Sequence, residues 1–484
     1  MPIAAEPELL KRRRTKIVAT VGPASSGRDV LTSLIDAGVN VFRLNMSHGT
    51  HDGHRAAYDA IRTAAESRGT PIAILADLCG PKIRCGKFDG GSIALHKEQS
   101  VTVTTRDVLG RPGLIPSQYK ELASDVKRGD RVLLDDGNLE LRVDRVEDTE
   151  IECTVVAGGT LKDRKGINLP GVNVSAPSLT PKDREDAVFA IGLGVDYIAL
   201  SFVRTAADVV ELRTLLDAHS ADVAIIAKIE KPEALANIDA ILGAADGLMV
   251  ARGDLGVELP AESVPITQTQ LIDLGRAQGK PVIVATQMLE SMITNARPTR
   301  AEVSDVATAV MQGTDAIMLS AETASGAFPV AAVETMARVA RRAEAYLWSQ
   351  GAFASITDHE ATPPPVALPD AVARATAQLS RDLRVRAIFV VSRSGTTARF
   401  VAAARPAAPL VALSDNVRAT RRMNLYWGVE PMHVDVADLD SANSLARKLA
   451  LEHDLASEGD FLLRVSGFSH EKESNVPKIS VLTV

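Results

Sequence analysis

The chain has 484 residues, a formal net charge of −7 and 24% charged side chains. A chain of this length is too long to fold around one hydrophobic core, which predicts two or three domains. The negative charge gives no support for nucleic-acid binding, and no apolar stretch of the sequence is long enough for a membrane-spanning segment. Three cysteines, an odd number without metal-site spacing, are typical of a reduced, cytoplasmic protein.

Eight short apolar segments alternate with helix-length stretches rich in Ala, Leu and Arg between residue 15 and about residue 345. Their continuous apolar character is typical of parallel strands that are buried on both faces. Eight such strands joined by helices predict an α/β fold, a (β/α)₈ TIM barrel. The expected strands are 16–21, 39–44, 71–76, 196–202, 223–229, 247–251, 281–285 and 315–319.

A long segment of different composition separates the third strand from the fourth. Residues 82–170 are rich in Gly, Asp, Val and Thr and contain turn signals such as residues 89–91. They predict a small β-barrel inserted at the mouth of the large barrel, where it could act as a lid. The large barrel resumes with a helix over 180–193, because Thr180-Pro181 is a helix-start signal.

The last quarter of the chain predicts a separate domain. Residues 351–369 contain three consecutive prolines and are interpreted as a linker. The catalytic barrel therefore comprises 1–81 and 171–350, and an open α/β domain occupies 370–484. Its expected elements are helix 370–382, strand 386–391, helix 396–404, strand 409–413 and helix 416–424.

Lys228 and Glu230 end the fifth expected strand and project from the same face, because side chains alternate across a strand. A carboxylate there can hold Mg²⁺ while the lysine faces an anionic substrate. A neighbouring Lys–Glu pair is more often a solvated ion pair. However, Asp254 follows the next strand, so the two carboxylates predict a magnesium site at the barrel mouth.

Other strand ends also carry polar residues. Arg43, Asn45 and Ser47 alternate at the end of the second strand, a set that suits a phosphate beside a cation. The alternative is a polar strand end wetted by solvent. The third strand ends at Asp77, and the seventh is followed by Thr286, whose hydroxyl could contact a substrate carboxylate or a developing carbanion. Core architecture does not explain so many convergent polar side chains.

The sequence resembles the pyruvate kinase family over essentially its whole length, most closely from about residue 14 to 345. Several long runs match in the same order, so chance does not explain the resemblance. The matching runs are 15–25, Arg43–Gly49, Asp77–Arg84, Lys228–Glu230, Ala251–Gly256, Ala285–Glu290 and Pro298–Glu302.

The resemblance implies phosphoryl transfer from phosphoenolpyruvate to ADP, giving pyruvate and ATP at the last step of glycolysis. It also implies a cytoplasmic enzyme, usually a homotetramer. Glu230 and Asp254 would bind Mg²⁺ (or Mn²⁺), Lys228 would neutralise the phosphoryl group and the enolate, and Arg43 would hold the phosphoryl group. This agrees with the chemistry of the residue types, since phosphoryl transfer needs mainly positioning and charge neutralisation.

The remaining family contacts divide between the two substrates. Backbone N–H groups of Gly253 and Asp254, together with Thr286, would grip the substrate carboxylate. Arg84 and, from the inserted domain, Lys165 would contact nucleotide phosphates when the lid closes. The nucleotide-binding positions implied by the resemblance are Arg84, Lys165, Asn45, His48 and Pro23.

One position departs from the K⁺-dependent members of the family. These members place K⁺ among positions matching Asn45, Ser47, Asp77 and the carbonyl of Leu78, and usually have Glu where this chain has Lys82. The resemblance therefore implies the branch that works without K⁺. A tethered ammonium can substitute, because a unit charge about 4 Å from an anion is worth roughly 4 kcal/mol. The alternative is a lysine that points to solvent.

In the C-terminal domain, a Ser/Thr-rich loop precedes an expected helix. Its backbone amides and hydroxyls can bind an anion, and the matching family loop holds the phosphate of an allosteric effector, a sugar phosphate or a nucleotide. A plain helix cap is the alternative interpretation. The loop residues are Ser392, Ser394, Gly395, Thr396 and Thr397.

Two other functions fit parts of this pattern. One is another metal-dependent enolate enzyme on the same barrel, of the phosphoenolpyruvate mutase or aldolase type. It would need neither the inserted domain nor Arg84 and Lys165, and its reaction would not depend on ADP. The other is a non-catalytic metabolite sensor, which predicts loss of catalytic residues. Lys228, Glu230, Asp254 and Thr286 are all present.

Overall fold

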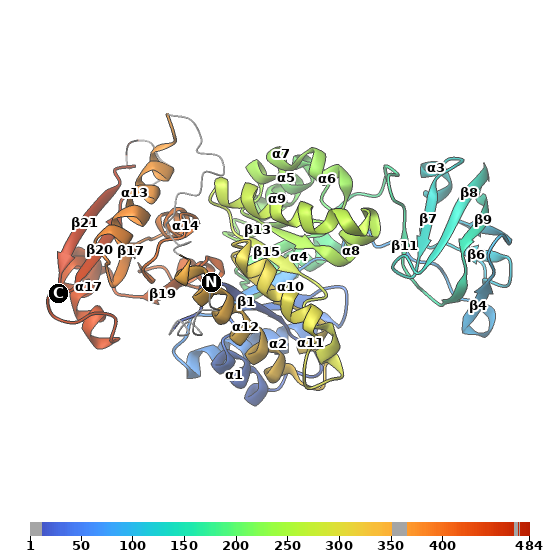
Figure 1. Ribbon diagram of the computed structural model, residues 1–484. Helices are drawn as coiled ribbons and strands as arrows, with labels where there is room; N and C mark the ends of the chain where they lie inside the picture. The colour runs from blue at the N-terminus through green and yellow to red at the C-terminus, as the bar shows by residue number, and fades with distance from the viewer. Residues whose placement is uncertain (1–11, 351–364, 469–472, 474) are drawn as a thin grey trace, which may run out of the picture.

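A computed structural model describes residues 12–350, 365–468, 473 and 475–484. Its centre is a closed barrel of parallel strands in the order β1-β16-β15-β14-β13-β12-β3-β2 (Figure 1). The predicted TIM barrel is confirmed, and each strand lies where the apolar segments place it. The strands are β1 (Lys16–Thr20), β2 (Val41–Asn45), β3 (Ala73–Asp77), β12 (Tyr197–Leu200), β13 (Ala224–Ile229), β14 (Gly247–Ala251), β15 (Val282–Ala285) and β16 (Ala316–Leu319).

Helices surround the barrel and follow its strands in sequence. The expected helix after the inserted segment is present, and Thr180 caps it reciprocally with Asp183: the Asp183 N–H donates to the Thr180 hydroxyl at 3.2 Å. The helices are α1 (Arg28–Ala37), α2 (His51–Ser67), α4 (Pro181–Leu193), α5 (Ala206–Ala218), α6 (Pro232–Ala236), α7 (Ile238–Ala244), α8 (Arg252–Glu258), α9 (Val264–Ala277), α10 (Arg300–Met311), α11 (Ala321–Ala324) and α12 (Pro329–Ser349).

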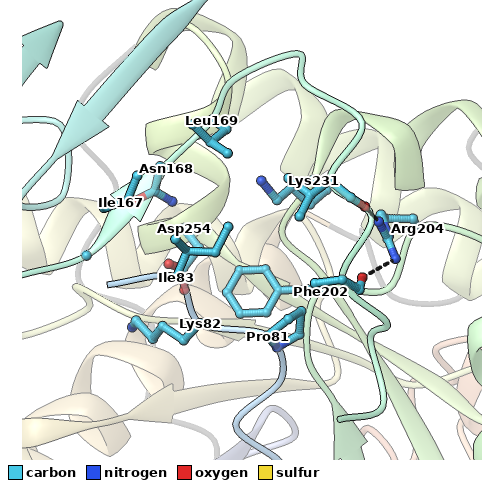
Figure 2. A pocket seen from close by; sticks show the side chains of 13 residues that line it. Pro81, Lys82, Ile83, Ile167, Asn168, Leu169, Phe202, Arg204, Lys231 and Asp254 are labelled. Atoms are coloured by element: carbon cyan, nitrogen blue, oxygen red, sulfur yellow. Dashed lines mark hydrogen bonds between the residues drawn. The ribbon is translucent and has the colours of Figure 1, made fainter. Parts of the chain in front are cut away.

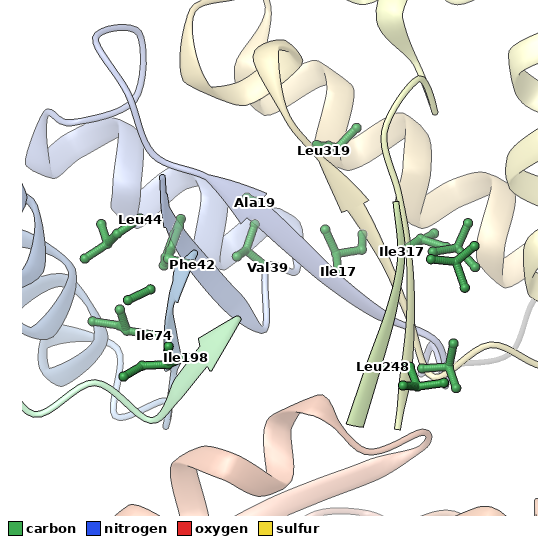
Figure 3. Close-up of a cluster of buried hydrophobic side chains, with 14 of the residues drawn as sticks. Ile17, Ala19, Val39, Phe42, Leu44, Ile74, Ile198, Leu248, Ile317 and Leu319 are labelled. Atoms are coloured by element: carbon green, nitrogen blue, oxygen red, sulfur yellow. The ribbon is translucent and has the colours of Figure 1, made fainter. Parts of the chain in front are cut away.

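Alternation along the strands divides the buried side chains into two layers. Side chains such as Ile17, Phe42 and Leu248 face the surrounding helices (Figure 3). Their neighbours, including Val18 and Met249, fill the barrel interior. Because both faces are fully buried, continuous apolar strands are the expected sequence pattern.

The inserted segment folds into a β-rich domain that stands to one side of the barrel (Figure 1). Six strands form a sheet in the order β11-β7-β8-β9-β5-β6, and β4 pairs with β10. The segment that enters this domain links the two edges of the six-stranded sheet, because Arg84 forms a single bridge with Gly166 beside β11 and Cys85 forms one with Ser117 beside β6. The elements are β4 (Ser92–Leu95), β5 (Ser100–Thr104), β6 (Leu114–Pro116), α3 (Leu122–Asp125), β7 (Arg131–Leu134), β8 (Leu139–Glu147), β9 (Glu150–Ala157), β10 (Gly159–Lys162) and β11 (Ile167–Asn168).

The C-terminal segment forms a five-stranded sheet, β19-β18-β17-β20-β21, in which only β21 is antiparallel to its neighbour. Most of the proposed linker, residues 351–364, lies outside the described residues. The elements are α13 (Leu368–Asp382), β17 (Ala387–Val391), α14 (Thr396–Ala403), β18 (Leu410–Ser414), α15 (Val417–Arg422), β19 (Val429–His433), α16 (Val436–Asp440), α17 (Ala442–Glu452), β20 (Phe461–Ser466) and β21 (Lys478–Thr483).

The helix expected over 416–424 is shorter than predicted. It ends at Arg422 and continues as a 3₁₀ turn over Met423–Leu425. The turn carries Leu425 into the cluster that fills the barrel interior, so tertiary packing decides where the helix ends. The inserted and C-terminal segments have buried clusters of their own, and the cluster of the inserted segment extends to Val172 and Val174. Within the described residues, none of the helices combines the length and apolar character needed to cross a bilayer.

Candidate active site

The polar side chains expected at the strand ends converge on one cavity of about 120 Å³ at the C-terminal mouth of the barrel. Strand geometry causes this convergence, because the C-terminal ends of all eight parallel strands meet at the same rim. The predicted residues that line the cavity are Arg43, Asn45, Ser47, His48, Asp77, Lys82, Arg84, Lys228, Glu230, Asp254 and Thr286.

Lys228 lies between two buried carboxylates. Its Nζ is 3.2 Å from Asp77 Oδ1 and 3.0 Å from Glu230 Oε1, and it donates to Ser201 Oγ at 2.6 Å. Burial alone would lower the pKa of Lys228, but the charges of Asp77 and Glu230 outweigh burial and raise it. The lysine is therefore held as an ammonium ion at the cavity.

Asp77 connects Lys228 to a second cation. Arg43 donates from Nε to Asp77 Oδ2 at 2.6 Å and from Nη1 to Thr20 Oγ1 at 3.1 Å. Burial tends to raise the pKa of Asp77, but Lys228 and Arg43 reverse this and hold it below its usual value. Asp77 thus stays ionised and orients two cations toward the same anion site.

Glu230 and Asp254 provide oxygen ligands suited to a divalent ion. Glu230 Oε2 accepts a hydrogen bond from the Phe202 N–H at 2.6 Å, and Asp254 lies in the first turn of α8. Burial raises the pKa of Glu230, and the nearby Asp254 charge raises it further against the opposing effect of Lys228. A cation between the carboxylates would relieve this repulsion.

The two carboxylates suit Mg²⁺ or Mn²⁺ at an open site better than they suit a metal whose ligands all come from the protein. No group of three or more His, Cys, Asp or Glu side chains with metal-site geometry exists in the described part of the chain. Mg²⁺ commonly uses one or two carboxylates and takes its other ligands from water and substrate oxygens. Two carboxylates at an open mouth match that preference.

Thr286 has a strained backbone beside Asp254. Its φ is 71°, and that of Gln287 is 54°, a region that a β-branched residue rarely occupies. The Gly253 N–H donates to Thr286 Oγ1 at 2.7 Å, while Arg252 donates from Nη2 to the Thr286 carbonyl at 2.6 Å. Such strain persists only when the surroundings impose it, and it is concentrated at functional sites.

Two of the positions that the sequence resemblance assigns to K⁺ accept hydrogen bonds within this chain. Asn45 Oδ1 accepts from the Ser47 N–H at 3.2 Å, and the Leu78 carbonyl accepts from Ser201 Oγ at 2.7 Å. Lys82 is exposed and lines the cavity from the loop that follows β3.

Not every predicted residue reaches the cavity. Arg84 lines it and donates to the Arg164 carbonyl at 3.1 Å, but Lys165 instead pairs with Asp135 at 2.6 Å inside the inserted domain. Pro23, Leu78 and Gly253 are not among the lining residues. Residues 392–395 join β17 to α14, and Thr396 and Thr397 begin that helix. They lie in the C-terminal domain, on the other side of the barrel from the inserted domain (Figure 1).

Comparison with known proteins identifies the family. The profile of the pyruvate kinase barrel domain matches residues 12–333, and that of the pyruvate kinase alpha/beta domain matches residues 370–480. The chain belongs to the pyruvate kinase family. It is 46% identical to pyruvate kinase of Geobacillus stearothermophilus (98% of this chain, 81% of the relative) and 43% identical to that of Mycobacterium tuberculosis (94% and 95%). A pyruvate kinase structure from Cryptosporidium parvum superposes with a TM-score of 0.90 at 38% identity, covering 98% of both chains.

A second pocket lies beside this cavity, at the junction between the inserted domain and the barrel. Figure 2 shows Asn168 and Leu169 of the inserted domain across from Phe202 and Lys231 of the barrel. Lys231 Nζ is 2.5 Å from Glu258 Oε1, and Asn168 Nδ2 donates to the same oxygen at 3.5 Å. Since Glu258 ends α8 and Asp254 lies in its first turn, the contact with the inserted domain and the candidate metal ligand belong to one short helix.

Sequence reasoning did not identify Ser201, Phe202, Lys231 or Glu258. Ser201 and Phe202 follow a strand end without a charged residue, and Phe202 acts through its backbone N–H. Lys231 and Glu258 are 27 residues apart, so their contact depends on how α8 turns back over the strand ends. One indication in the sequence placed Lys231 near the site, because Lys231 directly follows Glu230.

Replacing Lys231 with methionine is expected to lower stability by about 3–5 kcal/mol, because the 1% exposed Glu258 carboxylate loses its counter-charge. Differential scanning calorimetry of the full chain would record a lower Tm. The double variant Lys231→Met/Glu258→Leu removes both charges and should recover most of the loss. A single variant as stable as the unmodified chain would show that the pair does not support α8.

Proposed function

We propose that this pyruvate kinase transfers the phosphoryl group of phosphoenolpyruvate to ADP with Mg²⁺ or Mn²⁺ as its divalent ion, giving pyruvate and ATP. The observation that carries the proposal is the placement of Lys228 between Asp77 and Glu230, with Arg43 and Asp254 on the same cavity. Two fixed cations beside two metal-binding carboxylates suit an anionic phosphoryl donor.

Lys228 and Arg43 would neutralise the transferring phosphoryl group. Both are oriented by Asp77, so neither must reorganise when charge moves from the donor oxygen to the phosphoryl oxygens. Lys228 would remain beside the enolate oxygen after transfer. A bound divalent ion would supply additional charge neutralisation as a Lewis acid, held by Glu230 and Asp254.

Gly253 and Thr286 would hold the carboxylate end of the substrate. The Gly253 N–H donates to Thr286 Oγ1 at 2.7 Å, and Thr286 Oγ1 donates to the Ala285 carbonyl at 2.6 Å. A substrate carboxylate would take the place of both acceptors, receiving the Gly253 N–H and the Thr286 hydroxyl, which would then lie near the path for enolate protonation. The left-handed backbone at Thr286 supports this assignment.

The nucleotide would bind between the barrel mouth and the inserted domain. Arg84 already lines the cavity, whereas Lys165 would have to leave Asp135 and approach as the domain closes. Closure of this kind excludes water and completes the set of cations around the phosphates. The hinge contact between Asn168 and Glu258 would couple closure to α8.

A coupled assay with phosphoenolpyruvate, ADP and a divalent ion tests the proposal. We expect pyruvate to appear only when ADP and Mg²⁺ or Mn²⁺ are both present, with one ATP formed for each pyruvate. Consumption of phosphoenolpyruvate without ADP would favour another metal-dependent enolate enzyme. Binding of substrate without turnover would favour the sensor.

Full turnover is expected in K⁺-free buffer, because the Lys82 ammonium would supply the charge that K⁺ brings in other members. The variant Lys82→Glu should acquire a K⁺ requirement, since it reverses the charge of an exposed side chain on the cavity. Initial rates are compared in potassium and tetramethylammonium salts at equal ionic strength. Lys87→Glu, an exposed lysine of the inserted domain, is the matched control. Strong K⁺ dependence of the unmodified enzyme would contradict this prediction.

The C-terminal loop is proposed to bind a phosphorylated effector. Ser394 Oγ lies 2.9 Å from Thr396 Oγ1, and Gly395 has a φ of 88° directly before α14. This arrangement presents hydroxyls and amides at a helix start. Activation by a panel of phosphorylated metabolites is expected in the unmodified enzyme and should weaken in Thr396→Ala. An unchanged response of Thr396→Ala would remove the loop as the effector site.

A further inference from the structure

The loop that follows β2 forms one wall of the active-site cavity. Asn45 ends β2, and Ser47 and His48 line the cavity directly after it. Inside the loop, the Ser47 N–H donates to Asn45 Oδ1 at 3.2 Å, and the Met46 N–H donates to the Asp77 carbonyl at 2.9 Å. The carbonyl groups of Met46 and His48 are bound by side chains from two helices outside the loop.

Lys182 binds the first of these carbonyls from the start of α4. Its Nζ donates to the Met46 carbonyl at 2.9 Å and pairs with Asp186, one helical turn farther along α4, at 2.5 Å. Met46 and Asp186 are buried, whereas Lys182 is exposed. An exposed lysine loses side-chain entropy when it is held in one conformation. The buried carboxylate is therefore needed to direct the ammonium group toward Met46.

Asp186 also joins α4 to the start of α2. Its Oδ1 lies 2.8 Å from His51 Nε2, and only 4% of its side chain is exposed. The His51 ring stacks on Phe189 of α4, with ring centres 4.0 Å apart and planes at 1° to each other. Both carboxylate oxygens of Asp186 are thus in use, one by His51 and the other by Lys182. Asp186 is the shared partner of the two helices.

His54 binds the second loop carbonyl from α2. Its Nε2 lies 2.9 Å from the His48 carbonyl oxygen, and Gly49, which follows His48, has a φ of 86° that favours glycine. Burial lowers the pKa of His54, and its contact with His48 and the charge of Asp186 partly oppose this. The neutral ring can still donate from Nε2. The same two helices therefore hold both ends of the segment 46–48.

The residues proposed to bind the phosphoryl donor are anchored independently of these helices. Arg43 donates to Asp77 and Thr20. Lys228 lies between Asp77 and Glu230. None of these contacts involves α2 or α4. A change in the helix contacts should therefore move the loop after β2 and leave the donor site in place.

We propose that Asp186 is a positioning residue for the nucleotide. Through Lys182 and His51 it fixes the segment 46–48, so that two side chains of this segment face the incoming ADP. Asp186 is not among the residues that line the cavity, so it acts only through the loop. The inference rests on the proposed reaction, in which ADP accepts the phosphoryl group. It assigns to this buried carboxylate a part of the affinity for ADP and none of the affinity for phosphoenolpyruvate.

Steady-state kinetics of the full chain test the proposal, with ADP and phosphoenolpyruvate varied in turn at saturating Mg²⁺. Asp186→Asn keeps the shape of the side chain and removes the charge that directs Lys182. We expect the KM for ADP to rise about tenfold, the effect of losing one hydrogen bond to a charged group. The kcat and the KM for phosphoenolpyruvate should stay within about twofold, since the donor site has its own anchors.

Variants of Lys182 separate positioning from a general loss of structure. Lys182→Met should raise the KM for ADP as Asp186→Asn does, and the double variant should be no worse than either single variant, because both act through one contact. Lys182→Arg keeps a donor for the Met46 carbonyl and should restore most of the affinity for ADP. Glu185→Gln, an exposed carboxylate beside Asp186 on α4, is the matched control and should change neither KM.

Isothermal titration of ADP with Mg²⁺ measures the same affinity without turnover. If the unmodified chain turns over ADP and both Asp186→Asn and Lys182→Met keep its KM and its titrated affinity, the positioning role is wrong. A parallel loss of kcat and of both KM values, with a lower Tm and no rescue by Lys182→Arg, would also overturn it, because it indicates a structural role alone. An unmodified chain without turnover would overturn the proposed reaction instead, and the ADP titration would still decide on the loop.

Discussion

Lys228→Met is expected to lower kcat by roughly 10³- to 10⁵-fold, the effect of removing a cation that acts on a transferring phosphoryl group. Lys228 is fixed by Asp77, Glu230 and Ser201 at 2.6–3.2 Å, so its charge faces the donor without reorganisation. Methionine has a similar length and no charge. The loss should therefore appear in kcat rather than in the KM for ADP.

The variant also removes the positive charge between two buried carboxylates. Asp77 would keep Arg43 at 2.6 Å, but Glu230 would face Asp254 without Lys228, so the pKa values of both Asp77 and Glu230 should rise. A coupled assay at saturating substrates gives kcat, and calorimetry gives the Tm. Lys448→Met, an exposed lysine on α17 paired with Glu452, should change neither quantity. A kcat within tenfold of the unmodified enzyme would remove Lys228 from the proposed mechanism.

The strand ends of the barrel could be predicted because side chains alternate strictly along a strand. Alternation along β13 placed Lys228 and Glu230 on one face, and their ion pair at 3.0 Å agrees with that prediction. The closed parallel barrel then brings the ends of β2, β3, β13 and β14 to one rim. The local sequence is sufficient to predict these site residues, because the closed barrel brings strand ends that are distant in sequence to the same rim.

Contacts that depend on tertiary orientation could not be predicted. The Phe202 N–H that binds Glu230 is a backbone group, and no residue type identifies it in a sequence. Lys165 matched a family position, yet it pairs with Asp135, because the inserted domain stands away from the mouth. Similarly, Met423 and Asn424 leave the expected helix for a 3₁₀ turn, because this turn places Leu425 in the barrel interior.

Glu230→Gln is expected to weaken Mn²⁺ binding about a thousandfold. A carboxylate charge about 4 Å from a cation is worth roughly 4 kcal/mol at an effective dielectric near 20, and each 1.4 kcal/mol is a factor of about ten. Glutamine keeps the shape of the glutamate side chain and an oxygen that accepts from the Phe202 N–H. The loss of Mn²⁺ affinity therefore measures the effect of the carboxylate charge. Electron paramagnetic resonance of free Mn²⁺ during titration measures the affinity.

Protons compete with Mn²⁺ for the Glu230 carboxylate, so the pH dependence of Mn²⁺ affinity is a second test of this prediction. The pKa of Glu230 is raised by burial and by Asp254, so the metal-free carboxyl takes up a proton at a higher pH than usual. A raised pKa stabilises the fold below the unfolded value of about 4.5, and this contribution disappears as pH rises through the folded value. Mn²⁺ requires the ionised form, so its affinity should fall as pH decreases through that range.

The Glu230→Gln variant lacks the titrating group and should lose this part of the pH dependence. Asp254 remains in both proteins and contributes equally to the comparison. Glu262→Gln, an exposed carboxylate shortly after α8, serves as the control and should retain both the affinity and its pH profile. If Glu230→Gln binds Mn²⁺ as tightly as the unmodified chain, Glu230 is not a metal ligand, and the ion must be held by Asp254 with other oxygens at the mouth.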